Sequence, residues 1–388
     1  MDFASSDLII VGSGFFGATI ADRAAREMGL RVCVLDRRDH IGGNAWSHID
    51  PATGIEVHTY GSHLFHTSSK DVWDYVNRFS GFSTYRHRVI VRHKDRFFTM
   101  PMNLGTLSSL FGRFLSPSDA KALIAAEVAA AGIVNPTNFE EKAISLAGRT
   151  MYDAFIKGYT AKQWQTDPRQ LPAEIITRLP MRLTFDDFYF NDTYEGLPLD
   201  GYAAIFERML THPNIRIATG VDYFDVRASI PPSAPIVYTG PIDRYFDYRA
   251  GVLGWRTIDF ESEVVPVGDY QGASVVNYPD MDVPFTRIHE FRHLHPERSY
   301  QAERSIIFRE YSRFAERADE PYYPINATAD KAGYDSYRAM ADAEPGVIFG
   351  GRLGTYRYLD MHQAIGAAMK VFENQIRPHF AEGRGLKG

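Results

Sequence analysis

The sequence predicts an α/β protein with three parts: a discontinuous Rossmann-like dinucleotide-binding domain, an inserted α-helical domain and a mostly antiparallel β-sheet domain. Three observations support this fold class. A glycine-rich turn follows the first apolar strand, helical patterns dominate residues 103–176, and a strand and a helix return near the C-terminus. We expect the nucleotide domain to comprise residues 1–82, 201–240 and 340–388, the helical domain residues 103–176, and the sheet domain residues 83–102, 177–200 and 241–339.

The glycine-rich turn lies almost at the N-terminus, where residues 8–17 read LIIVGSGFFG. A buried strand leads into the G-x-G-x-x-G pattern and a helix-forming stretch follows, which is the context that makes the motif informative. Gly12 permits the tight turn, Gly14 lets the backbone approach a pyrophosphate, and Gly17 allows helix and strand to pack closely. The start of the helix then favours anionic phosphates. An ordinary strand-to-helix turn is the alternative explanation.

An acidic residue and then a pair of glycines follow the next strand, residues 31–35. Asp36 ends that strand about twenty residues beyond the glycines, where a carboxylate can accept hydrogen bonds from ribose hydroxyls. Residues 41–44 read IGGN. A glycine pair directly beyond the ribose carboxylate resembles the two-part motif of FAD proteins in the amine-oxidase and glutathione-reductase class. A simple turn at Gly42 and Gly43 is the alternative.

The middle of the chain predicts a hairpin and then several helices. Residues 89–92 and 96–100 are strand-like and flank a turn at residues 94–95. Ser116 and Asn138 are candidate helix caps. We expect helices at residues 120–131, 139–145, 150–164 and 171–179.

Strand patterns return in the second half of the chain. They are expected at residues 215–217, 235–238, 256–260, 273–277, 285–290, 305–308 and 347–351. A helix should follow the last of them, at about residues 361–376. This late strand and helix would extend the N-terminal sheet, which makes the nucleotide domain discontinuous.

The composition narrows the function classes. The 388 residues include 42 basic and 48 acidic side chains, and the net charge of −6 argues against a general nucleic-acid binder. The single cysteine, Cys33, excludes an intramolecular disulfide and is expected to pack in its strand. The N-terminal apolar runs are too short for a signal peptide or a membrane helix. We therefore expect a cytoplasmic protein with no membrane partner.

Two groups of histidines stand out. His63 and His66 lie three residues apart in the run YGSHLFHT at residues 60–67. No cysteine or glutamate cluster accompanies them, so we predict no metal; they either line a flavin ring or face solvent in a loop. His289, His293 and His295 have arginines between them, and we expect them to form a solvated edge.

A helix over residues 155–164 carries an unusual aromatic pattern. Phe155 and Tyr159 are four residues apart, as are Thr160 and Trp164, so two adjacent stripes carry rings and a hydroxyl. Such stripes usually pack in a core, but they can also form a platform on which a planar base stacks.

Two arginines lie in otherwise apolar surroundings. Arg178 and Arg287 are either snorkelling surface residues or guanidinium groups reserved for phosphate oxygens.

Taken together, these residues resemble the bacterial UDP-galactopyranose mutase family, from residue 9 to about residue 369. The diagnostic runs are IGGN at 41–44, YGSHLFHT at 60–67, IKGYTAKQW at 156–164, YTGPID at 238–243 and GGRLGTYRYLDM at 350–361. Such runs are much more specific than the glycine motif, which many flavoproteins share.

The resemblance implies a tightly bound FAD and the reversible isomerisation of UDP-galactopyranose to UDP-galactofuranose, which supplies galactofuranose for cell-surface glycans. In the family, N5 of the reduced flavin attacks the anomeric carbon and expels UDP, and the sugar–flavin adduct opens as an iminium ion. The oxidised enzyme is inactive, so an external reductant is implied. A homodimer or larger homo-oligomer is also expected. The alternatives are an FAD-dependent oxidoreductase of the amine-oxidase type and a non-catalytic binding protein related to GDP-dissociation inhibitors.

Family roles can be carried over by position. The substrate-binding set is Phe155, Tyr159, Thr160 and Tyr189 for the uridine, Trp164 beside the sugar, Arg178 and Arg287 on the diphosphate with Tyr323 and Tyr358, and Asn277 in the cleft with Arg256 and Arg352. His66 and His63 should face the flavin near N5, and with the two diphosphate arginines they form the expected catalytic set. Ile156 departs from relatives that have phenylalanine there, which puts in doubt only the packing of the uracil.

The expected cofactor-binding residues are spread over six segments of the chain. They are Gly12, Gly14, Phe15, Phe16, Gly17, Asp36, Arg37, Gly43, Asn44, His63, Val221, Thr239, Gly240, Gly351, Arg352, Leu359, Asp360 and Met361.

Overall fold

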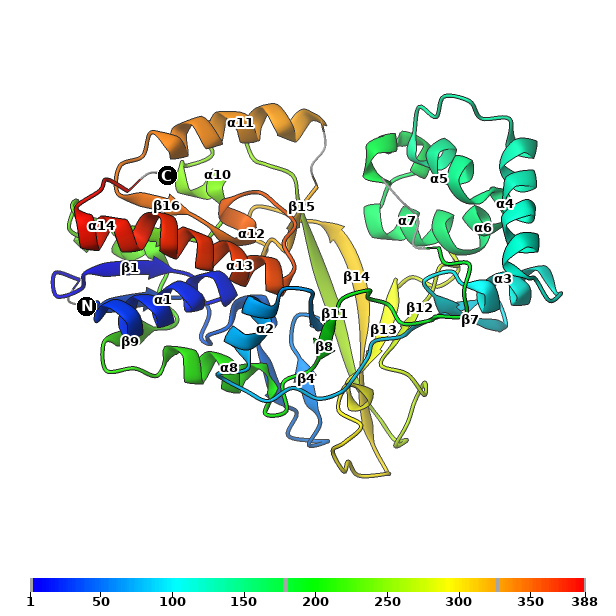
Figure 1. Cartoon of the computed structure of the whole chain (residues 1–388), viewed down its shortest axis with the longest axis horizontal. Coiled ribbons are helices and arrows are strands. Elements are labelled where there is room, and N and C mark those ends of the chain that lie inside the picture. Colours follow the sequence, from blue (N-terminus) through cyan, green and yellow to red (C-terminus); the bar gives the residue numbers. More distant parts are fainter. Residues whose placement is uncertain (1–2, 177–180, 326–327, 387–388) are drawn as a thin grey trace.

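A five-stranded parallel sheet forms one side of the molecule in the computed structural model, which describes residues 3–176, 181–325 and 328–386 (Figure 1). Its strand order is β16-β10-β1-β2-β9. The strands are β1 (Leu8–Val11), β2 (Val32–Leu35), β9 (Ile215–Ala218), β10 (Ile236–Tyr238) and β16 (Val347–Phe349). The pairing of β16 with β10 confirms that the C-terminal segment completes the N-terminal sheet.

Helices cover this sheet and bury its strands. Helix α1 (Phe15–Met28) starts at the glycine turn, ends at Gly29 in a left-handed conformation, and packs against α13 (Met361–Val371) and α8 (Gly201–Leu210). Strand β2 is buried at all four positions, as expected for a parallel strand with both faces covered. The predicted α/β class with a Rossmann-like domain is therefore confirmed.

A seven-stranded sheet lies beside this layer, with strand order β15-β11-β14-β13-β12-β6-β7 (Figure 1). Neighbouring strands run antiparallel except β12 and β6, which pair in parallel. Its strands are β6 (Val89–His93), β7 (Arg96–Met100), β11 (Trp255–Val265), β12 (Val275–Asn277), β13 (Arg287–Glu290), β14 (Ser305–Phe314) and β15 (Tyr323–Pro324). The β11–β14 ladder is the longest pairing in this sheet. The predicted strands are present: β6, β11 and β14 are longer than expected, β12 and β13 are shorter, and β7 has the expected bounds.

The helical segment lies at the far side of the second sheet, shown in cyan and green in Figure 1. It contains α3 (Leu104–Phe111), α4 (Pro117–Ala131), α5 (Phe139–Ala147), α6 (Arg149–Met151), a π-helical turn (Tyr152–Ile156) and α7 (Lys157–Trp164). Ser116 caps α4 in a capping box with Asp119, and Asn138 caps α5, as predicted.

The two ends of the helical segment meet at the sheet. The chain enters after β7, and a parallel bridge joins Met102 to Met181 on the way back. The Arg182 N–H donates to Met102 O at 2.8 Å, and the Leu104 N–H donates to Thr184 O at 2.9 Å. The helices thus leave and rejoin one edge of the sheet at almost the same place.

The other helices and strands lie outside the two large sheets and the helical segment. They are β3 (Ser47–Ile49) paired with β4 (Glu56–His58), β5 (Phe65–Thr67) paired with β8 (Tyr194–Gly196), α2 (Lys70–Val76), α9 (Tyr223–Val226), α10 (Ile242–Tyr245), α11 (Thr328–Asp342), α12 (Gly351–Gly354) and α14 (Arg377–Glu382). Within the described ranges, no helix combines the length and the apolar character needed to span a membrane.

Two expectations differ from the structure. The helix predicted over residues 171–179 is only a short 3-10 turn at Ala173–Ile175 in its described part, because Ile176 is already extended and residues 177–180 lie outside the described ranges. Helices α8 and α11 were not predicted. Helix α11 packs against α10 and β16, and it crosses the domain boundary expected between residues 339 and 340. The domain boundaries themselves stay a prediction.

Candidate active site

The glycine turn after β1 is packed on one side and open on the other. Gly12 has φ +101°, and a Cβ there would lie 2.0 Å from Thr239 Oγ1. A Cβ on Gly17 would lie 2.0 Å from Gly12 O, so helix α1 needs glycine to sit against the strand. At Gly14 the nearest atom to an added Cβ is Gly43 Cα, 3.9 Å away. Gly14 therefore presents bare backbone to the space in front of the turn, as a pyrophosphate site requires.

A cavity of about 240 Å³ opens in front of this turn. All the expected cofactor-binding residues except Asp360 line it: Gly12, Gly14, Phe15, Phe16, Gly17, Asp36, Arg37, Gly43, Asn44, His63, Val221, Thr239, Gly240, Gly351, Arg352, Leu359 and Met361. Asp360 lines the larger neighbouring cavity instead. Six separate segments of the chain thus converge on one groove, and its bare glycine backbone and the Asp36 carboxylate fit the chemistry expected of an FAD site.

Asp36 organises the turn as well as facing the groove. Its Oδ2 accepts hydrogen bonds from the Ser13 N–H at 2.9 Å and from the Ser13 hydroxyl, while Oδ1 accepts from the Arg38 N–H at 3.0 Å. Oδ2 already accepts two hydrogen bonds, whereas Oδ1 accepts one and keeps a second lone pair, so the residue can still accept from a ribose hydroxyl at Oδ1.

A second helix start faces the same groove. Asp360 caps α13 in a capping box with Gln363, and Met361 at the first helical position lines the cavity. The Arg352 guanidinium donates to Leu359 O and Tyr322 O, which fixes the loop before the helix. The positive end of a helix dipole at this place favours negative charge on a bound group.

A larger cleft of about 1120 Å³ continues from the cofactor groove. Both spaces are lined by Asn44, His63, Tyr322, Arg352 and Met361, so they are contiguous. The cleft wall is formed by the seven-stranded sheet, by α7 and by the β5–β8 region. The expected substrate residues that line it are Tyr159, Trp164, Tyr189, Asn277, Arg287, Tyr323 and Tyr358.

Phe155 and Thr160 are placed differently from the other expected uridine residues. Both are buried, and neither lines the cleft. Phe155 lies in the π-helical turn and packs edge-on against Phe98, with ring centroids 5.0 Å apart, in the core of the helical segment. Arg178 lies outside the described residues.

Arg287 and Glu310 form an ion pair at the floor of the cleft. Arg287 donates to the Tyr159 hydroxyl, and its Nε lies 3.2 Å from Glu310 Oε1. Burial alone would raise the pKa of Glu310, but Arg287 and the hydrogen bond from His289 outweigh it and lower the pKa to about 2. His289 in turn bonds to Ser62 at 2.8 Å, beside His63. One network thus joins helix α7, the β13–β14 pair and the loop before β5.

Asn277 lines the cleft as expected, whereas Arg256, which was expected beside it, is buried behind the cleft and does not line it. Both side chains keep buried polar atoms that have no partner among the described residues. Asn277 Oδ1 is buried and has no hydrogen-bond partner among the described residues. Arg256 is 1% exposed; it donates to Gln163 O and Ser312 Oγ, while its Nε and Nη1 lack partners within the described chain. Unsatisfied buried donors and acceptors are costly, and a polar ligand would supply the missing partner for Asn277.

His63 is held as a neutral ring between the two cavities. Its Nδ1 lies 2.7 Å from Gly61 O, so this nitrogen carries the proton and donates. Burial lowers the pKa of His63 to about 4, because the charged form would lose its hydration. The other ring nitrogen is therefore an acceptor.

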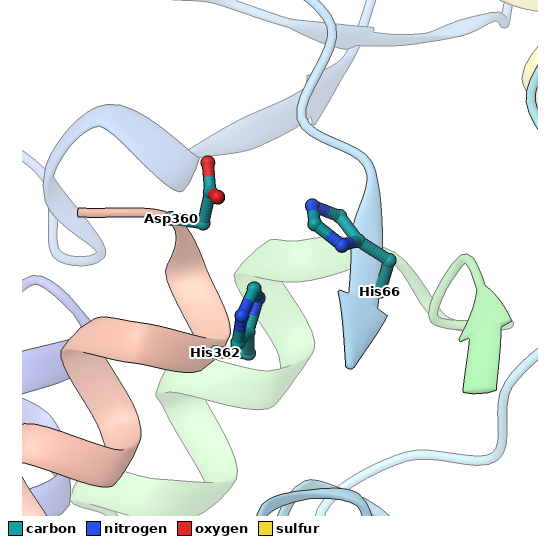
Figure 2. A group of neighbouring side chains, drawn as sticks. All are labelled: His66, Asp360 and His362. Atoms are coloured by element: carbon teal, nitrogen blue, oxygen red, sulfur yellow. The ribbon is translucent and has the colours of Figure 1, made fainter. Parts of the chain in front are cut away.

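His66 lies opposite Asp360 and His362 at the edge of the cleft (Figure 2). One ligand-type atom from each of the three residues lies within 4.8 Å of the others, a spacing compatible with a metal. Two features oppose a cation there: the Asp360 carboxylate is already the cap of α13, and the positive end of the helix dipole is adjacent.

The histidine group at residues 289–295 corrects an expectation from the sequence. His289 is 2% exposed and His295 is 1% exposed, so they are not a solvated edge. His289 bonds Glu310 from strand β13, and His295 bonds Glu297 and packs near Glu56. Strand β13 lies between β14 and β12 inside the seven-stranded sheet and is buried at Ile288, His289 and Glu290. Arg287 lies on the same face of the strand as His289 and also contacts Glu310.

Sequence reasoning missed several residues of the site. Glu310 lies two residues beyond the strand predicted at 305–308, and a buried glutamate in a strand gives no distinct signal. Asp192 and His87 lie in segments without regular periodicity. Their relation to the cleft is visible only in the folded chain, where Asp192 pairs with His66 and His87 lines the cleft.

Comparisons with known proteins now decide the family. The UDP-galactopyranose mutase family matches residues 154–358, and an NAD(P)-binding Rossmann-like domain matches residues 10–79. A probable UDP-galactopyranose mutase of Klebsiella pneumoniae is 43% identical over 367 residues, which cover 95% of this chain and 94% of that protein. The chain belongs to the UDP-galactopyranose mutase family. It is accordingly an isomerase.

One further relative and one solved structure are also similar to this chain. A dTDP-fucopyranose mutase of Escherichia coli is 38% identical over 374 residues, covering 95% of this chain and 98% of the relative. The fold resembles that of a crystal structure of reduced UDP-galactopyranose mutase, with a TM-score of 0.72 at 14% identity over 98% of this chain and 94% of that one.

Proposed function

We propose that this protein reversibly isomerises UDP-galactopyranose and UDP-galactofuranose with reduced FAD as its cofactor. The observation that carries the proposal is the continuity of the two cavities. A dinucleotide groove opens through His63 and Arg352 into a cleft whose floor holds a buried guanidinium and whose walls are aromatic. A cofactor ring bound in the groove would therefore lie beside a space suited to a nucleoside diphosphate sugar.

The FAD would lie along the groove, with its pyrophosphate at Gly12–Gly14 and an adenosine ribose at Asp36. When bound and reduced, the flavin supplies an electron-rich N5 that can act as a nucleophile on the anomeric carbon of the sugar. The chain itself binds, orients and excludes water, which is the usual division between a protein and its cofactor. The helix starts of α1 and α13 favour the negative charge of the pyrophosphate and of the reduced ring.

The nucleotide part of the substrate would be held by the aromatic wall and the arginines. We assign the base to Tyr159 and Tyr189, the sugar to Trp164, and the diphosphate to Arg287 and Arg178 with Tyr323 and Tyr358. Charge-assisted hydrogen bonds are about twice as strong as neutral ones, and they strengthen further as negative charge gathers on the departing phosphate. Phe155 and Thr160 would act behind this wall, since both are buried away from the cleft.

The two histidines would act on the sugar beside the flavin. His63, whose pKa is lowered to about 4, is a neutral acceptor at physiological pH. His66 lines the cleft on the other side, with Asp360 and His362 as neighbours. We assign both as catalytic residues with Arg178 and Arg287. An external reductant keeps the flavin active, and the expected setting is a cytoplasmic homodimer that supplies galactofuranose for cell-surface glycans.

A second substrate deserves the same test because the dTDP-fucopyranose mutase is 38% identical over almost its whole length. The two reactions share the ring contraction and differ in the base and in the group at carbon 6. The decisive assay is chromatographic separation of the two isomers after each nucleotide sugar is incubated with dithionite-reduced enzyme. We expect UDP-galactofuranose to convert faster than the dTDP-sugar. Conversion of the dTDP-sugar alone would replace the proposal.

An FAD-dependent oxidoreductase of the amine-oxidase type is the remaining alternative. It predicts oxygen uptake or substrate-linked reduction of the flavin, whereas the proposed isomerisation consumes no electrons and needs added dithionite only to activate the enzyme. Loss of isomerisation in the oxidised enzyme, with recovery on reduction, would favour the mutase.

A further inference from the structure

Asp192 pairs with the buried His66, and neither the motifs nor the comparisons identify this pair. Asp192 Oδ2 lies 2.6 Å from His66 Nδ1, and the Ser68 hydroxyl donates to Oδ1 at 2.6 Å. The Phe190 ring stacks on the imidazole, with centroids 3.7 Å apart and an interplanar angle of 13°. The imidazole is thus fixed at one nitrogen and on one face.

The pair is built by the short β5–β8 sheet. His66 lies in β5 opposite Glu195 of β8, and Asp192 and Phe190 precede β8 in the same extended segment. The side chains of His66 and Asp192 therefore meet although 126 positions separate them in the sequence. A pair set by strand register holds its geometry more firmly than one placed on free loops.

The protonation of the pair follows from its chemistry. Burial alone would raise the pKa of Asp192, but the hydrogen bonds from Ser68 and His66 outweigh it, so the pKa is lowered. An ionised carboxylate only accepts, which means that His66 Nδ1 must carry the proton that it donates. Nε2 is the nitrogen that remains for the cleft, where the ring faces Asp360 and His362 (Figure 2).

We propose that Asp192 is a positioning residue that keeps a proton on His66 Nδ1 and leaves Nε2 as the proton acceptor in the cleft. The inference rests on the proposed function, because His66 acts on the sugar there. Converting a pyranose into a furanose breaks the bond from C1 to O5 and forms one from C1 to O4. One proton leaves the 4-hydroxyl and one arrives on O5. An imidazole that takes a proton at Nε2 and returns it balances this exchange, and the carboxylate stabilises the imidazolium in between.

The first test reads the tautomer directly in the FAD-loaded enzyme. Nitrogen-15 NMR of histidine-labelled protein, with His66→Gln used to assign the signals, should show the proton on Nδ1 in the wild type. Asp192→Ala should move it toward Nε2. Ser68→Ala is the matched control: it removes the other hydrogen bond to the same carboxylate and should leave the tautomer unchanged. A wild-type spectrum with the proton on Nε2, or an unchanged spectrum in Asp192→Ala, overturns the proposal.

The second test separates positioning from mere support of the fold. Asp192→Ala should lower kcat by about tenfold or more while KM and flavin content change little, because the residue acts through His66. The double variant His66→Gln/Asp192→Ala should be no slower than His66→Gln alone. A further loss in the double variant would assign Asp192 a structural role instead. A wild-type enzyme that isomerises neither nucleotide sugar would overturn the proposed function, whereas the nitrogen spectra would still decide the proton's position.

Discussion

Arg287 and Glu310 form an ion pair at the floor of the cleft, with Nε and Oε1 3.2 Å apart. The same guanidinium donates to the Tyr159 hydroxyl on helix α7. The carboxylate holds the arginine in place behind the cleft, and the arginine leaves donors on its open side for an anionic ligand.

Replacing Arg287 with alanine should remove the main described cation of the substrate site. We expect kcat/KM to fall by roughly ten- to hundred-fold or more, because a charge-assisted hydrogen bond contributes about 1.5–3 kcal/mol. The measurement is isomer separation by chromatography, with the flavin absorbance band recorded in parallel. The band should be retained, since Arg287 does not line the cofactor groove.

The matched control for this variant is Arg309→Ala. Arg309 is adjacent to Glu310 in β14 but points to the opposite face, where it pairs with Glu263. Its activity should stay near the wild-type value. Equal losses in the two variants would show that charge on this strand, and not the cleft guanidinium, is responsible.

Substitutions of two glycines in the turn, Gly14 and Gly17, should have different effects on flavin binding and on stability. Gly14→Val adds bulk on the open side, so we expect a folded protein with little bound flavin. Gly17→Ala places its Cβ 2.0 Å from Gly12 O, so we expect a clear loss of melting temperature as well. Gly29→Ala is the control for backbone strain, since Gly29 has φ +68° with nothing near its missing Cβ. Normal flavin content in Gly14→Val would contradict the assignment of the groove.

His87 should make stability depend on pH. Burial, with help from Arg287 and His289, lowers its pKa from 6.5 to about 3. Between these values the unfolded chain binds a proton that the folded protein does not. The free energy of unfolding therefore falls as pH drops from about 6.5 to 3, by up to about 1.4 kcal/mol per pH unit.

The check on His87 is a comparison of melting temperatures at pH 7 and pH 5. The variant His87→Gln should lose less stability over this interval than the wild type. His48→Gln, at an exposed position, serves as the control and should follow the wild type. Parallel curves for His87→Gln and the wild type would show that the imidazole does not titrate as inferred.

Lys162 ties helix α7 to the loop between β12 and β13. Its ammonium donates to the carbonyl oxygens of Tyr278, Asp280, Val283 and Phe285. Lys162→Met would leave these acceptors without their donor, so we expect the melting temperature to fall by about 4 °C or more. KM should rise, because Tyr159 and Trp164 lie on the same helix.

The control for the α7 anchor is Lys157→Met, an exposed position at the start of the helix. Calorimetry and the isomerisation assay should both give wild-type values for it. If Lys162→Met also gives wild-type values, the hydrogen bonds from Lys162 to the four carbonyl oxygens do not stabilise the cleft wall.

The sequence was most informative where local pattern and function coincide. The glycine turn, the strand before it and Asp36 lie within thirty residues, so their arrangement could be predicted without knowing the rest of the fold. The capped helix after Ser116 was predictable for the same reason. The expected cofactor residues converge because the parallel strands that carry them end at one edge of a sheet.

Residues that meet only through tertiary pairing could not be found in this way. Asp192 acquires its meaning from the β5–β8 register, and Glu310 from its position opposite Arg287 in the β13–β14 ladder. His289 was expected to be solvent-exposed because of its charged neighbours, but it lies in an interior strand of the sheet that is buried at three of its four positions. Helix α11 was missed because its polar sequence hides the face that packs against β16. The substrate roles of individual residues stay predictions.

The closeness of Met102 and Met181 makes the helices between them a natural unit of exchange. Since the helical segment begins and ends at neighbouring points of the sheet, a short linker between Met102 and Met181 could replace it without interrupting a strand. Conversely, the corresponding stretch of another mutase could be grafted between the same two positions. Such chimeras would reveal whether preference for the nucleotide base travels with the transplanted helices or stays with the scaffold.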